Sequence, residues 1–229
     1  MLLKHLYHLN NMNDKPIKVF VVDDHALFRE GVKFVLSQMA GVEVVGEAEN
    51  GKAFLEALNE QRPDVVFIDV SMPEMDGVTA VEKAIAKDPD LKMIALTSYG
   101  DEVYYYKMIK AGALGFVLKK AGKDQLEQAM HAVLKGESYF PGDLMRKLIF
   151  KVSNDGEDAI VNGEIALSSR EKEVLLHICQ GYTNNEISEK LFISPKTVDN
   201  YRSALLQKTG TRNSAHMVMF AIKNRLIEV

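Results

Sequence analysis

The chain has 229 residues, 47% of them hydrophobic, so it can bury more than one core, and its length favours two domains. No apolar stretch approaches the roughly 20 residues that a membrane helix needs, and Lys, His and Asn interrupt the apolar residues of the first ten positions, which argues against a signal peptide. The formal net charge is −4, and the single cysteine, Cys179, excludes a disulfide or a thiolate metal site, so a cytoplasmic protein without a membrane partner is expected.

Short apolar runs alternate with helical patterns after an N-terminal extension, residues 1–15, in which Met12 is a second candidate start. Runs bounded by turn-forming residues predict five strands, at residues 17–22, 42–48, 65–69, 93–97 and 115–119. The segments between them predict helices that begin at His25, Gly51, Gly77, Asp101 and Lys123. Strict alternation of strands and helices predicts an α/β domain over residues 16–137, with a doubly wound, five-stranded parallel sheet.

Chemically distinctive side chains stand at the carboxyl ends of these strands. In a parallel sheet all these ends lie along one edge, where open α/β sheets build their sites. The residues collected there are Asp23, Asp24, Asp69, Thr97 and Lys119. Neighbouring carboxylates repel one another unless a cation joins them, and oxygen ligands favour a hard ion, so Mg²⁺ is the predicted cofactor.

The same residues predict phosphoryl transfer to a carboxylate, with Asp69 as nucleophile, Thr97 as hydrogen-bond donor and Lys119 beside a phosphoryl oxygen. No G-x-x-x-x-G-K-[S/T] loop is present, which indicates that the phosphate comes from another protein and not from a nucleotide. Taken alone, Asp23 and Asp24 could be the capping charges of a helix. Their register with the other three residues favours a functional site.

Charge divides the chain unevenly. Residues 167–229 contain nine Lys or Arg and six Asp or Glu, whereas the rest of the chain contains 19 and 26. Such a split suggests an acidic metal or signalling module joined to a nucleic-acid module. The stretch between Phe150 and Ala166 is polar, contains two Gly and lacks a helical period, so residues 138–166 are expected to form a linker.

Helix start signals dominate the part after the linker. Ser168 and Thr183 each begin an S/T-x-x-E capping box, and Ser194 is an N-cap followed by Pro195 at the first helical position. A fourth helix is expected over residues 214–225. These signals predict an all-α domain of four helices that contains a helix-turn-helix.

The third of these helices has an apolar side and a polar side. Val198, Tyr201 and Leu205 recur at i, i+3 and i+7 and are expected to face the core. The polar side would lie in the major groove of DNA, where Asp199 is unfavourable unless it accepts a hydrogen bond from cytosine. The residues expected to contact bases or phosphates are Lys196, Thr197, Asn200, Arg202, Ser203 and Lys208.

Residues 17–136 resemble the receiver domain of two-component response regulators. The matching segments are Val-Val-Asp23-Asp24-His, Phe-Ile-Asp69-Val-Ser-Met-Pro-Glu-Met-Asp-Gly, Leu-Thr97-Ser-Tyr and Gly-Phe116-Val-Leu-Lys119-Lys. The resemblance implies a flavodoxin-like fold in which a sensor histidine kinase phosphorylates Asp69.

The resemblance also implies roles for the neighbouring residues. Asp24 and Asp69 would ligate Mg²⁺ together with the backbone carbonyl of Ser71, while Asp23 would help through water. Thr97 and Phe116 match the switch pair of the family, in which a hydroxyl moves toward the phosphoryl group and an aromatic ring follows inward. Ser71 and Tyr99 are expected to set the lifetime of the phosphate.

Residues 167–227 resemble the LuxR-type DNA-binding domain. The matching residues are Arg170, Glu171, Gly181, Asn185, Glu186, Ile187, Ser194, Thr197, Val198 and Lys208. Together the two resemblances identify the chain as a NarL/FixJ-type response regulator, with the DNA-binding domain at 167–229. They imply a transcriptional regulator that binds double-stranded DNA, dimerises when phosphorylated and catalyses no reaction beyond its own phosphorylation and dephosphorylation.

Two other functions fit parts of the sequence. A phosphorelay or adaptor protein would share the receiver without regulating genes, and specific, salt-dependent DNA binding by residues 150–229 separates it from a transcriptional regulator. An aspartyl-phosphate hydrolase would share the nucleophile, but the second domain argues against it.

Overall fold

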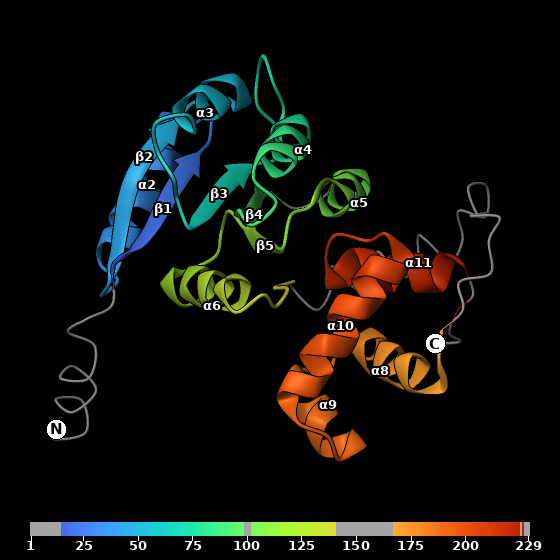
Figure 1. The fold of residues 1–229 in the computed structure, drawn as a ribbon. Helices are drawn as coiled ribbons and strands as arrows, with labels where there is room; N and C mark the ends of the chain where they lie inside the picture. Colours follow the sequence, from blue (N-terminus) through green and yellow to red (C-terminus); the bar gives the residue numbers. More distant parts are fainter. Residues whose placement is uncertain (1–14, 99–101, 141–166, 225, 227–229) are drawn as a thin grey trace, which may run out of the picture.

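The computed structural model describes residues 15–98, 102–140, 167–224 and Leu226, which form two domains (Figure 1). The N-terminal domain contains a parallel five-stranded sheet in the order β2-β1-β3-β4-β5, as the alternation of elements predicted. Its strands are β1 (Ile17–Val22), β2 (Val42–Ala48), β3 (Val65–Asp69), β4 (Lys92–Thr97) and β5 (Gly115–Leu118). The predicted strand limits differ from these by no more than one residue.

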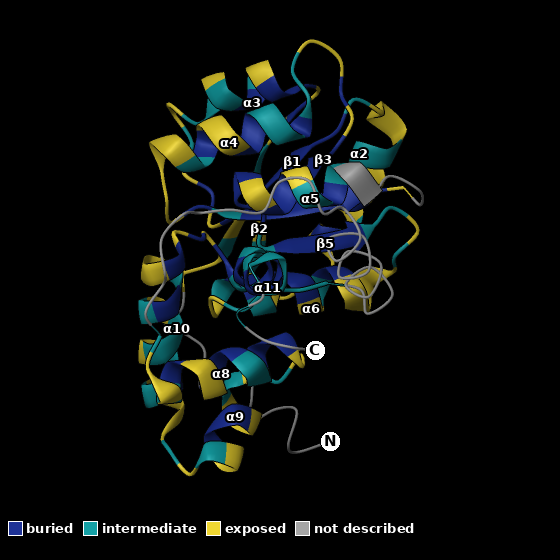
Figure 2. Ribbon diagram, turned by 90° about the vertical axis from the view of Figure 1, so that its right-hand side faces the viewer, coloured by how far each residue is buried: buried dark blue, intermediate teal, exposed yellow. Residues whose placement is uncertain are grey.

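Helices cover both faces of the sheet. One face carries α2 (Ala26–Ser37) and α6 (Lys123–Leu134), and the other carries α3 (Gly51–Ala57), α4 (Gly77–Lys87) and α5 (Glu102–Ala111). Successive strand residues point to opposite faces, so in β1 Val19 and Val21 enter one apolar cluster while Phe20 and Val22 enter the other. Figure 2 shows the sheet as the buried centre of this domain. The helix start predicted at Asp101 lies outside the described residues.

The backbone after α6 runs beside β5. The Tyr139 amide donates to the carbonyl of Leu114 at 3.0 Å, and the Phe116 amide donates to the carbonyl of Tyr139 at 2.8 Å. These bonds form an isolated parallel bridge between Gly115 and Tyr139. The ring of Phe140 then lies 5.5 Å from the ring of Phe116, measured between centroids. The segment that leaves the N-terminal domain is therefore paired with its sheet.

The C-terminal domain is helical, with α8 (Ser169–Cys179), α9 (Asn184–Leu191), α10 (Pro195–Thr209) and α11 (Ser214–Lys223). The three predicted N-caps are confirmed: the side chains of Ser168, Thr183 and Ser194 each accept a hydrogen bond from the backbone amide three residues on. Of the three expected core residues, Val198 and Leu205 are fully buried, and Tyr201 is partly buried against the same apolar cluster. No described helix is both long and apolar enough to cross a membrane.

The turn between α9 and α10 contains an unusual residue. Phe192 adopts the left-handed conformation, with φ at 53°, and the residue is 95% exposed. A residue with a Cβ is strained in this region, and an exposed ring recovers no energy by packing. The turn is therefore formed at a local cost in stability.

Candidate functional site

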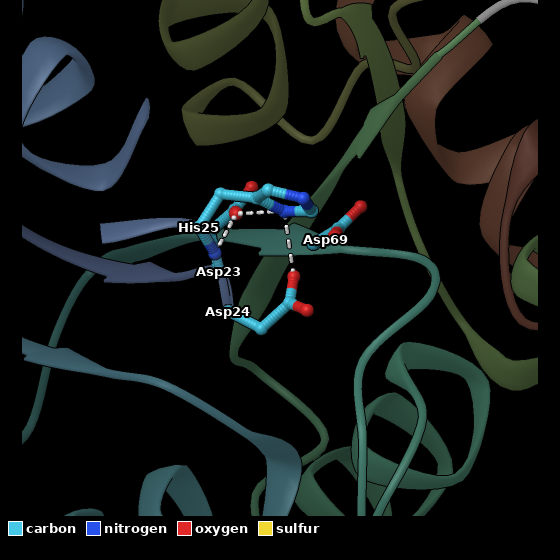
Figure 3. Close-up of side chains that lie close together, drawn as sticks. All are labelled: Asp23, Asp24, His25 and Asp69. Carbon is cyan, nitrogen blue, oxygen red and sulfur yellow. Dashed lines mark hydrogen bonds and ion pairs between the residues drawn. The ribbon is translucent and has the colours of Figure 1, made fainter. Parts of the chain in front are cut away.

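Acidic side chains gather where the strand order reverses, at the adjoining ends of β1 and β3. Asp23 directly follows β1 and is fully buried, and Asp69 ends β3 and is 5% exposed. Ligand atoms of Asp23, Asp24, His25 and Asp69 all lie within 4.8 Å of one another (Figure 3). The structure thus brings together the three carboxylates that the strand pattern placed at one edge.

Lys119, immediately after β5, joins two of these acids. Its Nζ lies 2.7 Å from Oδ2 of Asp23 and 2.9 Å from Oδ2 of Asp69. The same ammonium lies 4.9 Å from the centroid of the Phe28 ring, on α2, whose face attracts cations. One cation is therefore held between two buried carboxylates and an aromatic ring.

Burial and charge act against each other on these groups. The pKa of Asp69 is raised, first because burial disfavours its charged form, while the hydrogen bond and charge of Lys119 oppose that rise. Burial alone would lower the pKa of Lys119, but its bonds to Asp23 and Asp69 outweigh burial and raise the pKa above its ordinary value. Lys119 therefore stays charged and favours the carboxylate form of Asp69, which is the form able to act as a nucleophile.

His25 is a member of the cluster that the sequence reasoning left out. Its Nδ1 lies 2.8 Å from Oδ1 of Asp24, and its backbone amide donates to Oδ1 of Asp23 at 2.8 Å. The side chain is 70% exposed. The sequence feature that could have placed His25 in the cluster is its position next to Asp24, at the start of a predicted helix.

The predicted switch pair is buried near this crevice. Thr97 ends β4 with 4% exposure, and its hydroxyl donates to the carbonyl of Ser98 at 3.0 Å. Phe116 is fully buried, and its ring meets that of Tyr105 edge-on at 5.3 Å between centroids. Tyr99 lies outside the described residues.

The loop after β3 holds Asp69 by close backbone contact. A backbone hydrogen bond from Ser71 favours the Asp69 carboxylate. Further along, the amide of Gly77 donates to the carbonyl of Val70 at 2.9 Å. A Cβ at Gly77 would stand only 2.0 Å from the carbonyl oxygen of Asp69, so this position needs the absence of a side chain.

The donor set of the crevice fits a small hard cation. Asp23, Asp24 and Asp69 offer carboxylate oxygens that lie within 4.8 Å of one another, and Mg²⁺ prefers oxygen ligands of this kind. Oδ1 of Asp24 is buried 2.8 Å from Nδ1 of His25 and has no hydrogen-bond partner in the described residues, so this oxygen is left for a ligand. An acidic cluster of this composition is suited to bind a divalent ion beside the nucleophile.

The residues predicted to contact DNA lie along α10, mostly on its surface. Lys196, Asn200 and Ser203 are exposed, and Thr197 is half-buried against the Ser194 cap at 2.8 Å between hydroxyl oxygens. Asp199, which was unfavourable near DNA, accepts a hydrogen bond from the side chain of Asn184 on α9. Part of its charge is therefore engaged within the domain.

Two residues that were expected to contact phosphates bind partners within their own domain. The Arg202 guanidinium donates to Oγ of Ser214 at 2.7 Å and to the carbonyl of Tyr182 at 3.3 Å. Lys208 forms an ion pair of 2.8 Å with Glu171, the acid of the first capping box. Both side chains would need to change partners to reach a phosphate, because these contacts hold them within the domain.

Two family profiles match the chain, one in each domain. The profile of the response regulator receiver domain matches residues 19–131, and that of the luxR family of bacterial regulatory proteins matches residues 166–221. The oxygen regulatory protein NreC of Staphylococcus carnosus (strain TM300) is 35% identical over 216 residues, 93% of this chain and 100% of that protein. The transcriptional regulatory protein DegU of Brevibacillus brevis is 35% identical over 231 residues, 95% of this chain and 98% of that protein.

Solved structures of response regulators are also similar to this chain. The RcsB response regulator of Salmonella typhimurium is similar with a TM-score of 0.56 and 28% identity, over 90% of this chain and 97% of that one. A structure of the two-component response regulator RcsB in complex with DNA matches with a TM-score of 0.55 and 27% identity, over 91% of this chain and 98% of that one.

Proposed function

This chain belongs to the NarL/FixJ family of two-component response regulators, and we propose that it is a transcriptional regulator whose DNA binding is controlled by phosphorylation of Asp69. The observation that carries the proposal is the position of Lys119, within 2.9 Å of Asp69 and 2.7 Å of Asp23 in one buried crevice. A carboxylate beside a fixed ammonium and further acids is suited to accept a phosphoryl group. A cluster of buried charges of this kind is typical of a functional site and not of a structural core.

Asp69 would attack the phosphorus of a phosphohistidine on a sensor kinase and form an acyl phosphate, while the histidine nitrogen keeps the electrons of the broken bond. Asp23, Asp24, Asp69 and the carbonyl of Ser71 would hold Mg²⁺, which neutralises the charge of the phosphoryl oxygens when bound. Lys119 would release one carboxylate and pair with a phosphoryl oxygen. Beyond this transfer and the later hydrolysis of the acyl phosphate, we assign the chain no catalysis.

The output would be DNA binding in the cytoplasm as a homodimer. Exposed residues of α10 would read the major groove, with Asn200 and Ser203 near bases and Lys196 near phosphates. Thr197, Arg202 and Lys208 complete the proposed contact set, the last two after leaving their present partners. We keep the domain boundaries proposed from the sequence, with the receiver at 16–137, the linker at 138–166 and the DNA-binding domain at 167–229, although Tyr139 at the start of the linker pairs with β5.

The first experiment compares the purified full chain, with Mg²⁺, before and after treatment with acetyl phosphate. We expect the wild type to gain both dimerisation and affinity for DNA selected from a random pool, and Asp69→Ala to gain neither. Asp90→Asn is the matched control, because Asp90 is an exposed acid that precedes β4, at the end of the strand away from the crevice. Equal DNA binding in treated and untreated wild type would refute phosphate control.

A second experiment separates gene regulation from a phosphorelay or adaptor role. Lys196→Ala should weaken binding to all sequences alike and reduce the dependence of log affinity on log salt by about one unit. Asn200→Ala should instead reduce the preference for the selected sequence. Binding that is absent, or that shows no sequence preference, would favour the adaptor role.

A further inference from the structure

Helix α11 of the DNA-binding domain packs against α5 of the receiver (Figure 1). Ala215 and Met219 of α11 are 2% and 1% exposed, and they share one apolar cluster with Met108 and Ile109 of α5. Side chains from two domains thus form a single buried core.

One polar residue joins the facing ends of the two helices. Oδ1 of Asn213 caps α11 by accepting from the amide of His216 at 2.7 Å. Its Nδ2 donates to the carbonyl of Ile109 at 3.1 Å and to that of Ala113 at 3.0 Å. Asn213 is only 2% exposed, and both ends of its amide are engaged.

The receiver side of this contact is the carboxyl-terminal end of α5. The last carbonyls of a helix have no partner within the helix and carry the negative end of its dipole. Arg212 lies there as well and donates from Nη1 to the carbonyl of Ala111 at 2.9 Å. A guanidinium and a side-chain amide therefore bind three carbonyls at or just beyond the end of α5, and all three bonds cross between the domains. The carbonyl of Ile109 also accepts from the amide of Gly112 at 3.1 Å.

The same helix contacts the proposed switch residues one turn earlier. Tyr105 packs edge-on against Phe116, and its hydroxyl stands at the outer hydrogen-bonding limit, 3.5 Å, from Oγ1 of Thr97. Tyr105 and Ile109 are four residues apart, which is about 6 Å along a helix. A shift of Thr97 or Phe116 would thus act on α5 close to the carbonyl that Asn213 binds.

We propose that Asn213 is a positioning residue that holds the DNA-binding domain closed against the end of α5 until Asp69 is phosphorylated. The proposal rests on the function proposed above and names the contact through which the control acts. The closed and open arrangements are the two states, and the Asn213 bonds to Ile109 and Ala113 exist only in the closed one.

The test is Asn213→Asp in the full chain. Aspartate caps helices as well as asparagine does, so α11 keeps its N-cap. The amide donor, however, becomes a carboxylate oxygen that faces two carbonyl oxygens. Without any phosphodonor, we expect a larger radius of gyration by small-angle X-ray scattering and a gain in DNA affinity of about tenfold, within the usual range of coupling between sites.

Two further variants make the test specific. Asn213→Ser keeps a capping hydroxyl, removes both N–H donors of the longer amide and adds no charge, so it should open the protein to a smaller extent. It also covers the case in which the aspartate variant does not fold. Ser169→Asp adds the same charge to an exposed position of α8, away from the contact, and should leave the arrangement closed.

The outcomes separate this inference from the proposed function. A compact Asn213→Asp and Asn213→Ser with wild-type DNA affinity would overturn the inference, even if acetyl phosphate opens the wild type. Opening of both variants, with Ser169→Asp closed, supports it. If the variants open while acetyl phosphate leaves the wild type compact, the closing contact is supported and phosphate control is refuted.

Discussion

Substitution of Gly77 by alanine should damage the phosphoacceptor site without touching any charged group. The added Cβ would stand 2.0 Å from the carbonyl oxygen of Asp69 and 3.0 Å from Cα of Val70, both atoms of the backbone. Since real Cβ atoms stay at least 3.0 Å from such neighbours, the start of α4 and the end of β3 must separate by about 1 Å.

The size of the effect follows from this displacement. Overpacking costs about 1–3 kcal/mol, and the upper value applies because backbone atoms cannot rotate away. Alanine returns at most about 1 kcal/mol of helix propensity, because Gly77 is the first residue of α4, which leaves a net loss of about 2 kcal/mol in the free energy of unfolding. A misplacement of about 1 Å at a reacting group can lower a rate about 100-fold, so phosphorylation of Asp69 should slow by that order.

Urea unfolding measures the first quantity, and intact-mass spectrometry after timed exposure to acetyl phosphate and Mg²⁺ measures the second. Gly31→Ala is the control, because Gly31 lies in α2 with no atom within 4 Å of an added Cβ. That variant should gain up to about 1 kcal/mol and phosphorylate normally. Wild-type stability and rate in Gly77→Ala would show that the contact with Asp69 does not restrict the loop.

Three other predictions concern the C-terminal domain. Ser168→Ala removes a side-chain cap and should lower the free energy of unfolding by about 1 kcal/mol in urea titrations. Phe192→Gly relieves the left-handed strain and should raise it by about 1 kcal/mol, while Phe192→Ala should give no such gain. The pKa of His216 is lowered by burial and by the charges of Lys110 and Arg212, so the closed form binds a proton less readily than an exposed histidine does. His216 therefore leaves the closed form at full stability above about pH 6.5 and destabilises it as the pH falls below that value. Small-angle scattering between pH 7.5 and 5.5 should show that the protein opens in acid, and His216→Gln should reduce this opening.

Much of the receiver site could be predicted because its geometry follows from topology. Once strands and helices alternate, every strand end lies on one edge, and residues far apart in sequence such as Asp23, Asp69 and Lys119 must be neighbours. The three N-caps of the C-terminal domain were equally accessible, because a capping box is a local pattern.

The missed features depend on contacts that no local pattern encodes. Asn213 has the sequence context of an ordinary N-cap, which accounts for its Oδ1, but its Nδ2 binds carbonyls about 100 residues earlier in the chain. Arg202 was expected near phosphates from its helical position. A long side chain can turn either way from the same Cα, and here it turns toward Tyr182 and Ser214.

The pairing of Tyr139 with β5 also bears on aggregation. Its carbonyl and amide occupy the Phe116 amide and the Leu114 carbonyl, which would otherwise be open groups on an edge strand. An isolated receiver cut after Glu137 would expose this edge and invite strand addition between copies. A receiver cut after Phe140 would keep the edge covered, so three residues decide whether the separated domain stays monomeric.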